Sequence, residues 1–233
     1  MLKIEQFRYA SDNLGYLIFG ERSAFAVDGG AVDEILEFLK IQRLELIYVT
    51  NTHAHYDHMM GNDELLNHSQ ATYLSTSKLA EKGDVLLEGE NILIYSTPGH
   101  TADSICLHAG TGLISGDTLF NGTVGNCFTG NLREFYHSIK KLMALPDQTV
   151  IYPGHDYVGD SMLFAKRLEP GNTDLDAFLS SYDPGHVYST LAEERKVNPY
   201  LRFNDKRIIA ILKKRGLPAS TEYERWQSLM SIT

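Results

Sequence analysis

Thr52-His53-Ala54-His55-Tyr56-Asp57-His58 follows, after two intervening residues, Leu46–Val49, a short apolar run that predicts a β-strand. The segment therefore places four potential metal ligands at the carboxyl end of a strand. The first two histidines are two residues apart, so in extended chain their side chains point to the same side, while the aspartate and the last histidine fall in the next turn. Protonated histidines this close would repel one another, and imidazole and carboxylate suit zinc, iron and manganese. The segment predicts a site that can supply ligands to two adjacent metal ions.

Three further segments repeat the order of strand, glycine turn and potential ligand. They are Thr97–Thr101 (TPGHT), Ser115–Phe120 (SGDTLF) and Tyr152–Tyr157 (YPGHDY). One such segment means little, because glycine commonly ends strands and histidine or aspartate commonly sits in turns. Four in order indicate one site. The predicted ligands are His53, His55 and His100 for one ion, Asp57, His58 and His155 for the other, and Asp117 as a carboxylate able to bridge both.

Composition excludes several classes of protein. The 233 residues are 43% hydrophobic and 22% charged, as in ordinary globular proteins, so disorder is excluded as the main description. No apolar run approaches the roughly 18 residues of a membrane span, and charges interrupt the first twenty residues, so neither a membrane span nor a secretory signal is predicted. A cytoplasmic location is therefore expected. The two cysteines, Cys106 and Cys127, cannot form a disulfide framework or a four-cysteine zinc site.

The pattern of apolar residues predicts an α/β body followed by a helical tail. Strands are predicted at Leu14–Phe19, Ala24–Val27, Leu46–Val49, Ile92–Tyr95 and Val150–Tyr152, and helices near Val32–Leu39 and, after an Asn131 cap, Leu132–Met143. After about Val158 the strand signals stop. Helices are predicted at Thr173–Ser181, Ser189–Lys196, Asp205–Arg215 and Ser220–Met230, the last with Ser220 as its N-cap.

These motifs resemble the metallo-β-lactamase superfamily and, within it, the glyoxalase II (hydroxyacylglutathione hydrolase) branch. The resemblance covers nearly the whole chain. Beyond the four ligand segments it includes Ser11-Asp12-Asn13, Glu169–Asn172, Ser189–Glu194 and Asn198–Arg202. It implies an α/β fold, an αββα sandwich with a small C-terminal helical domain that helps to hold the substrate. The division expected is a catalytic domain at 1–165 and a helical substrate-binding domain at 166–233.

The resemblance also implies the chemistry. Two divalent ions, most simply zinc with iron or manganese as alternatives, would activate a bridging water for attack on a small-molecule thioester, whose thiolate leaves readily. Asp57 and Asp117 are the carboxylates expected to take part in catalysis. For Asp57 a role as general base competes with ligation, and its spacing favours ligation.

The expected glutathione-binding residues differ from the family pattern. In the loop after GDTLF, Asn126 and Phe128 stand where the family usually has Lys and Tyr, and Tyr157 alone keeps the expected identity. Near the C-terminus Glu224 and Gln227 align with an Arg and a Lys, although Arg225 can stand in for the Arg. Tight binding of glutathione is therefore not expected, and the sequence leaves the identity of the low-molecular-weight thiol open.

The sequence alone does not exclude several other functions. A lactonase or ester hydrolase would use the same site, and some nucleases of the superfamily share its ligand motif. The net charge of −9 argues against nucleic acid as partner, although residues 195–215 carry eight Lys or Arg against one acidic residue. A β-lactamase, a persulfide dioxygenase and a catalytically dead binding module fit less well. The sequence predicts no oligomeric state.

Overall fold

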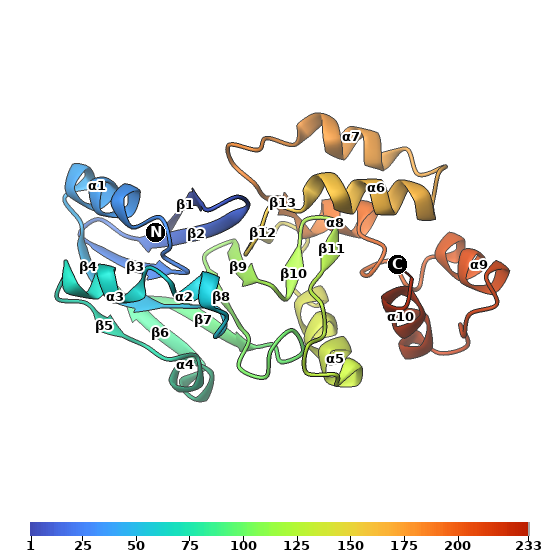
Figure 1. Cartoon of the computed structure of the whole chain (residues 1–233), viewed down its shortest axis with the longest axis horizontal. Helices are drawn as coiled ribbons and strands as arrows, with labels where there is room; N and C mark the ends of the chain where they lie inside the picture. Colours follow the sequence, from blue (N-terminus) through green and yellow to red (C-terminus); the bar gives the residue numbers. More distant parts are fainter. Residues whose placement is uncertain (233) are drawn as a thin grey trace.

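The computed structural model describes residues 1–232 and contains two β-sheets packed against each other (Figure 1). The first sheet has the strand order β1 (Lys3–Tyr9), β2 (Asn13–Phe19), β3 (Ser23–Val27), β4 (Glu45–Thr50), β5 (Thr72–Tyr73). The second has the order β13 (Ser189–Thr190), β12 (Val150–Pro153), β9 (Gly112–Gly116), β8 (Ile105–Ala109), β7 (Glu90–Ser96), β6 (Asp84–Leu87). A short hairpin, β10 (Leu119–Phe120) and β11 (Thr123–Val124), forms a two-stranded sheet of its own beside β9 and β12.

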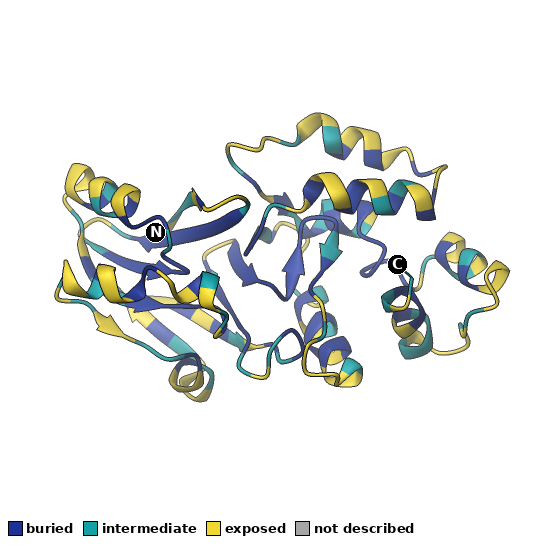
Figure 2. Cartoon of the chain, in the orientation of Figure 1, coloured by how far each residue is buried: buried dark blue, intermediate teal, exposed yellow. Residues whose placement is uncertain are grey.

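Helices flank the two sheets. In chain order they are α1 (Val32–Gln42), α2 (Tyr56–Met59), α3 (Asn62–Asn67), α4 (Thr76–Lys82), α5 (Leu132–Met143), α6 (Val158–Leu168), α7 (Asp174–Ser181), α8 (Leu191–Val197), α9 (Lys206–Lys214) and α10 (Glu222–Met230). Their outward faces are exposed while the strands between them are largely buried (Figure 2). The predicted αββα architecture is confirmed.

Three apolar clusters account for these layers. Between the sheets, Tyr16 and Phe25 of the first sheet share a cluster with Ile92 and Leu107 of the second. On the outer face of the first sheet, α1 buries Ile35 among β-strand side chains. The outer face of the second sheet packs against α5 and the C-terminal helices, which make up a third cluster. Every residue of β2 is buried because both of its faces are covered.

Local sequence explains why α5 forms where it does. The Asn131 side chain accepts a hydrogen bond from the backbone N–H of Glu134 and so caps the helix, as predicted. Phe135, Ile139 and Leu142 recur at helical spacing and are all buried against the second sheet. This helix also packs against the C-terminal tail, because the ring centroid of Trp226 in α10 lies 5.7 Å from that of Phe135.

The helical tail differs from the prediction in three places, of which one is α6, a helix that the sequence pattern did not predict. Strand signals were expected to stop after Val158, but Ser189 and Thr190 pair with β12 as β13, and the helix predicted from Ser189 begins only at Leu191. These two residues add to a free edge of the second sheet, which local sequence does not reveal. The N-cap of α10 is Thr221 and not Ser220, because Glu224 completes a capping box with Thr221.

The expected division between residues 165 and 166 falls within α6, and it stays a prediction. No helix in residues 1–232 is long and apolar enough to cross a membrane.

Candidate metal centre

The predicted ligands come together where four strands end. His53 and His55 follow β4, and Asp57 and His58 lie in the short helix α2 just beyond them. The other three ligands, His100, Asp117 and His155, follow β7, β9 and β12. Residues up to 102 positions apart in the chain therefore meet at one edge of the sandwich, as the repeated strand–turn–ligand order predicted.

One group of ligand atoms consists of His53, His55, His100 and Asp117, which lie within 4.8 Å of one another. The Nδ1 atom of His55 is 2.8 Å from Nε2 of His53 and 3.1 Å from Nε2 of His100. The carboxylate of Asp117 lies 3.3 Å from Nε2 of His100. These nitrogen and oxygen atoms converge on one point.

The second group consists of Asp57, His58 and His155. The Nε2 atoms of His58 and His155 are 3.2 Å apart, and the Asp57 carboxylate lies 3.4 Å from Nε2 of His155. The two ring planes are nearly perpendicular, with centroids 5.1 Å apart.

Asp117 lies between the two groups. Its Oδ1 is 3.4 Å from Nε2 of His58, while its Oδ2 is 3.6 Å from Nε2 of His155 and also faces the histidines of the first group. Oδ1 is buried and has no hydrogen-bond partner among the described residues. A buried carboxylate oxygen without a donor is costly, and a cation would satisfy it.

The donor set fits two divalent cations. Ring nitrogens 2.8–3.2 Å apart approach closely enough to share one cation, because zinc–nitrogen bonds are about 2.0–2.1 Å long. Burial, with the positive charge of His58 second, lowers the pKa of His53 to about 2, so this ring is neutral and free to ligate. Five imidazoles and two carboxylates are the ligands that suit zinc, iron or manganese.

Two glycines allow the ligand turns to approach so closely. A Cβ at Gly154 would lie 2.2 Å from Oδ1 of Asp117. Gly116, immediately before that aspartate, has φ +49°, and a Cβ there would lie 2.4 Å from Oγ1 of Thr52. Gly154 is thus required by space, and Gly116 by both conformation and space.

The family models match both parts of the chain. The model described as "Metallo-beta-lactamase superfamily" matches residues 13–83 and 77–155, and the one described as "Hydroxyacylglutathione hydrolase C-terminus" matches 156–229. A hydroxyacylglutathione hydrolase of Nitrosomonas europaea is 32% identical over 227 residues, covering 90% of this chain and 86% of that protein. The chain belongs to the hydroxyacylglutathione hydrolase family of the metallo-beta-lactamase superfamily.

Two further proteins are similar to this chain, the first over its whole length and the second in fold. The hydroxyacylglutathione hydrolase of Pseudoalteromonas translucida is 31% identical, covering 100% of this chain and 97% of that protein. The crystal structure of ETHE1 from Myxococcus xanthus superposes with a TM-score of 0.68 at 27% identity, covering 97% of this chain and 99% of that one. The resemblance to the family that the motifs indicated is confirmed.

Asp28 supports the centre of this hydroxyacylglutathione hydrolase family member and was not predicted. Its carboxylate accepts hydrogen bonds from the backbone N–H and Oγ1 of Thr52, at 2.6 and 2.8 Å, and lies 2.9 Å from Nδ1 of His58. Burial alone would lower the pKa of His58, but Asp28 and Asp117 raise it to about 11. Surroundings that stabilise a proton on this ring also stabilise a metal cation there. Asp28 follows the predicted strand Ala24–Val27, but its glycines, Gly29-Gly30, come after it and not before it as in the other ligand turns.

Other side chains also orient the ligands. Asp12 lies 3.0 Å from Nδ1 of His155, and the backbone oxygen of Asn126 lies 3.0 Å from Nδ1 of His100. Asn13 donates to Oδ2 of Asp57 at 2.8 Å. Burial raises the pKa of Asp57, but this hydrogen bond and His58 outweigh it and lower the pKa overall, so the carboxylate stays ionised.

A cavity of about 350 Å³ opens over the ligands. Its lining contains the three predicted substrate-binding residues, Asn126, Phe128 and Tyr157, together with Phe120. Phe128 is 66% exposed, with its ring centroid 5.1 Å from that of His100. Tyr157 stacks on His155, with centroids 5.1 Å apart. The cavity therefore has ligands at its base and aromatic rings at its rim.

The C-terminal residues aligned with the family's cations have other partners. Glu224 accepts hydrogen bonds from the backbone N–H groups of Ser220 and Thr221 at the start of α10. Arg225 binds Asn204 and the backbone oxygens of Ala219 and Ser220. Neither lines the cavity above the ligands.

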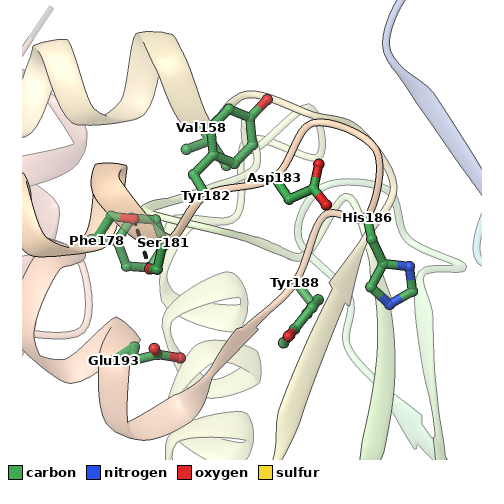
Figure 3. A pocket seen from close by; sticks show the side chains of 8 residues that line it. All are labelled: Val158, Phe178, Ser181, Tyr182, Asp183, His186, Tyr188 and Glu193. Carbon is green, nitrogen blue, oxygen red and sulfur yellow. Dashed lines mark hydrogen bonds between the residues drawn. The ribbon is translucent and has the colours of Figure 1, made fainter.

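A second cavity, of about 370 Å³, lies in the helical tail (Figure 3). Phe178 and Ser181 of α7, Glu193 of α8, and Tyr182 and Tyr188 of the intervening segment are among its lining residues. None of the clustered ligands borders it.

Proposed function

We propose that this chain hydrolyses a thioester between a small acyl or hydroxyacyl group and a low-molecular-weight thiol, using two divalent metal ions. The observation that carries the proposal is the position of Asp117, whose carboxylate faces histidines of both ligand groups. Membership of the hydroxyacylglutathione hydrolase family supports the thioester as substrate class.

The proposed ligands are His53, His55 and His100 for one ion, Asp57, His58 and His155 for the other, and Asp117 for both. When bound, two such ions lower the pKa of a water molecule and polarise a carbonyl group. We propose zinc for both, with iron or manganese as alternatives, from the donor set.

The protein side chains orient the reactants. Asp28, Asp12 and the backbone oxygen of Asn126 lie within hydrogen-bonding distance of the outer ring nitrogens of His58, His155 and His100 and so fix which nitrogens face the site. Because Asn13 holds Asp57 toward His155, we assign this carboxylate to ligation and not to general base catalysis.

No protein nucleophile is needed. The hydroxyl of Ser115 is buried and donates to the backbone oxygen of Leu119 at 2.6 Å, and Ser104 lies 2.8 Å from the hydroxyl of Thr101. A thiolate has a conjugate-acid pKa of about 8.5 and leaves without a strong general acid.

We assign the thiol part of the substrate to the rim formed by Asn126, Phe128 and Tyr157. Asn126 and Phe128 supply no cation for a peptide carboxylate. We therefore propose a thiol whose binding depends less on charged contacts than the binding of glutathione does. We also keep as proposals the division at 1–165 and 166–233, a cytoplasmic location, and a substrate that is a small molecule and not nucleic acid.

The test is a hydrolysis panel on the metal-loaded protein, with thioesters of several thiols, lactones and phosphodiesters. We expect rates on at least one class of thioester to exceed those on lactones and phosphodiesters. Preferential cleavage of lactones, or of a phosphodiester, would contradict the proposed reaction. A protein without metal is the matched control for background hydrolysis.

A further inference from the structure

Glu194 is a buried carboxylate that the proposed chemistry does not use. It lies in α8 of the helical tail and is 0% exposed. One carboxylate oxygen accepts hydrogen bonds from the backbone N–H of Gly122, at 3.1 Å, and from Oγ of Ser189, at 2.8 Å. The other accepts from the same N–H, at 2.9 Å, and from Nδ2 of Asn198, at 2.8 Å.

These bonds join the tail to the turn between β10 and β11. Besides Gly122, the turn residue Asn121 donates to Oγ of Ser189 at 2.5 Å, and the backbone oxygen of Thr123 accepts from Asn198 at 3.0 Å. Three consecutive residues of the turn are thus held from α8 and β13. Gly122 has φ +89°, a conformation that favours glycine, and glycine loses more conformational freedom on ordering than any other residue, so the hydrogen bond from its N–H to Glu194 helps to hold it.

The held turn lies between the ligands and the rim of the cavity. Before it, Phe120 packs on Tyr157, with ring centroids 5.0 Å apart. After it, the chain reaches Asn126 and Phe128, whose backbone groups bond to His100 at 3.0 and 3.2 Å. The contacts to His100 fix the far end of this loop, and the contacts to Glu194 fix its start.

A buried carboxylate needs a reason to be retained. Burial raises the pKa of Glu194 to about 7, which shows that the site disfavours the charge despite its three hydrogen-bond donors. An apolar side chain would pack α8 without that cost but would leave the N–H of Gly122 without its partner. The function that a hydrogen-bonding side chain serves here, and an apolar one cannot, is to hold the turn.

We propose that Glu194 is a positioning residue for substrate binding: by holding Gly122 it fixes loop 121–128, and with it Asn126 and Phe128, where the thiol part of the substrate binds. The inference rests on the proposed function for the identity of the substrate. The helical tail would then set affinity for the thiol from a distance, without touching the metal ions.

The variants separate this role from general stability. Glu194→Ala should raise KM for a cleaved thioester by roughly tenfold, because the Gly122 N–H loses its hydrogen-bond acceptor, with kcat changed by less than about threefold. Metal content per chain should stay that of the natural protein. Glu194→Gln should keep KM within about twofold, because its amide oxygen still accepts from Gly122 and its NH2 group can donate to Ser189.

Glu193→Ala is the matched control. Glu193 precedes Glu194 in the same helix, but its carboxylate binds the backbone N–H and Oγ1 of Thr190, each at 2.7 Å, and does not contact the loop. This variant loses the capping box of α8 and should leave KM unchanged.

Amide hydrogen exchange of residues 119–130 provides a readout that needs no substrate. Exchange of this segment should speed up in Glu194→Ala and stay unchanged in Glu193→Ala and Glu194→Gln. If Glu194→Ala does not fold, Ser189→Ala should show the same pattern more weakly, because it removes one bond to the carboxylate and the partner of Asn121.

Three results would overturn the inference: a fall in kcat together with metal loss at constant KM, an equal rise in KM in the Glu193→Ala control, or unchanged exchange of residues 119–130 in Glu194→Ala. If the natural protein cleaves no thioester, the proposed reaction fails, while the exchange measurement still decides whether Glu194 holds the loop.

Discussion

Asp117 and His155 differ in how much of the centre depends on them. Asp117 faces both ligand groups, whereas His155 belongs to the second group. Replacing Asp117 by Ala should therefore lower the affinity for both ions and reduce activity at the same time. His155→Ala should first lower the occupancy of the second site. Metal analysis after dialysis, together with rates, measures this.

His137→Ala is the matched control for these two variants, because His137 is exposed on α5 outside the cluster. It should retain both ions. Full metal content and full rate in His155→Ala would show that the ligand assignment is wrong.

Asn126 and Phe128 should limit binding of a glutathione thioester. We expect S-lactoylglutathione to be a poor substrate with the defect mainly in KM, since the ligands are in place but the rim supplies no cation. Asn126→Lys with Phe128→Tyr should lower KM by roughly tenfold for each charge-assisted contact recovered.

Steady-state kinetics on the natural protein and the double variant check this expectation. A KM of the natural protein already in the low micromolar range, or a KM that the double replacement leaves unchanged, would mean that other residues bind the thiol.

The effect of Glu194 on the stability of α8 should depend on pH. Its pKa is about 7 in the folded protein against an ordinary 4.5, so its stabilising contribution is complete below pH 4.5 and is lost as pH rises through 7. Glu194→Gln cannot ionise, so its stability relative to the natural protein should rise between pH 4.5 and 8 by up to roughly 3 kcal/mol.

Urea unfolding of both proteins across that pH range, at equal metal loading, measures the difference. Other titrating groups are common to both proteins and cancel. A difference that does not change with pH would contradict the raised pKa.

Helices and strands that depend on their own local sequence were predictable. Those that form through contacts with residues distant in the chain were not. The apolar run Leu14–Phe19 becomes β2, and Asn131 caps α5 as its spacing with Glu134 predicted. By contrast, β13 exists because the edge of β12 is free to pair with it. The role of Asp28 depends on Thr52 and His58, 24 and 30 residues away, so spacing alone could not reveal it.

The Thr221 cap was predictable from the local sequence. Ser220 and Thr221 are both good N-caps, but only Thr221 has a glutamate three residues later, the mark of a capping box. For the site, all seven expected ligands meet because the strand–turn–ligand order is repeated, whereas the orienting residues around them come from turns without that order.

Over the whole molecule, the basic residues at 195–215 help to hold the tail together. Arg202 is buried and forms a salt bridge with Glu169, and Arg195 lies 2.9 Å from Asp147. This pairing favours a structural role for Arg195 and Arg202.

The central claim is that two metal ions held by seven residues hydrolyse a thioester. The most direct test titrates metal into the metal-free protein and measures bound ions per chain by elemental analysis alongside the rate of thioester hydrolysis. We expect the rate to reach its maximum only as the content reaches about two ions per chain. Full thioesterase activity with one ion per chain, or with none, would contradict the account.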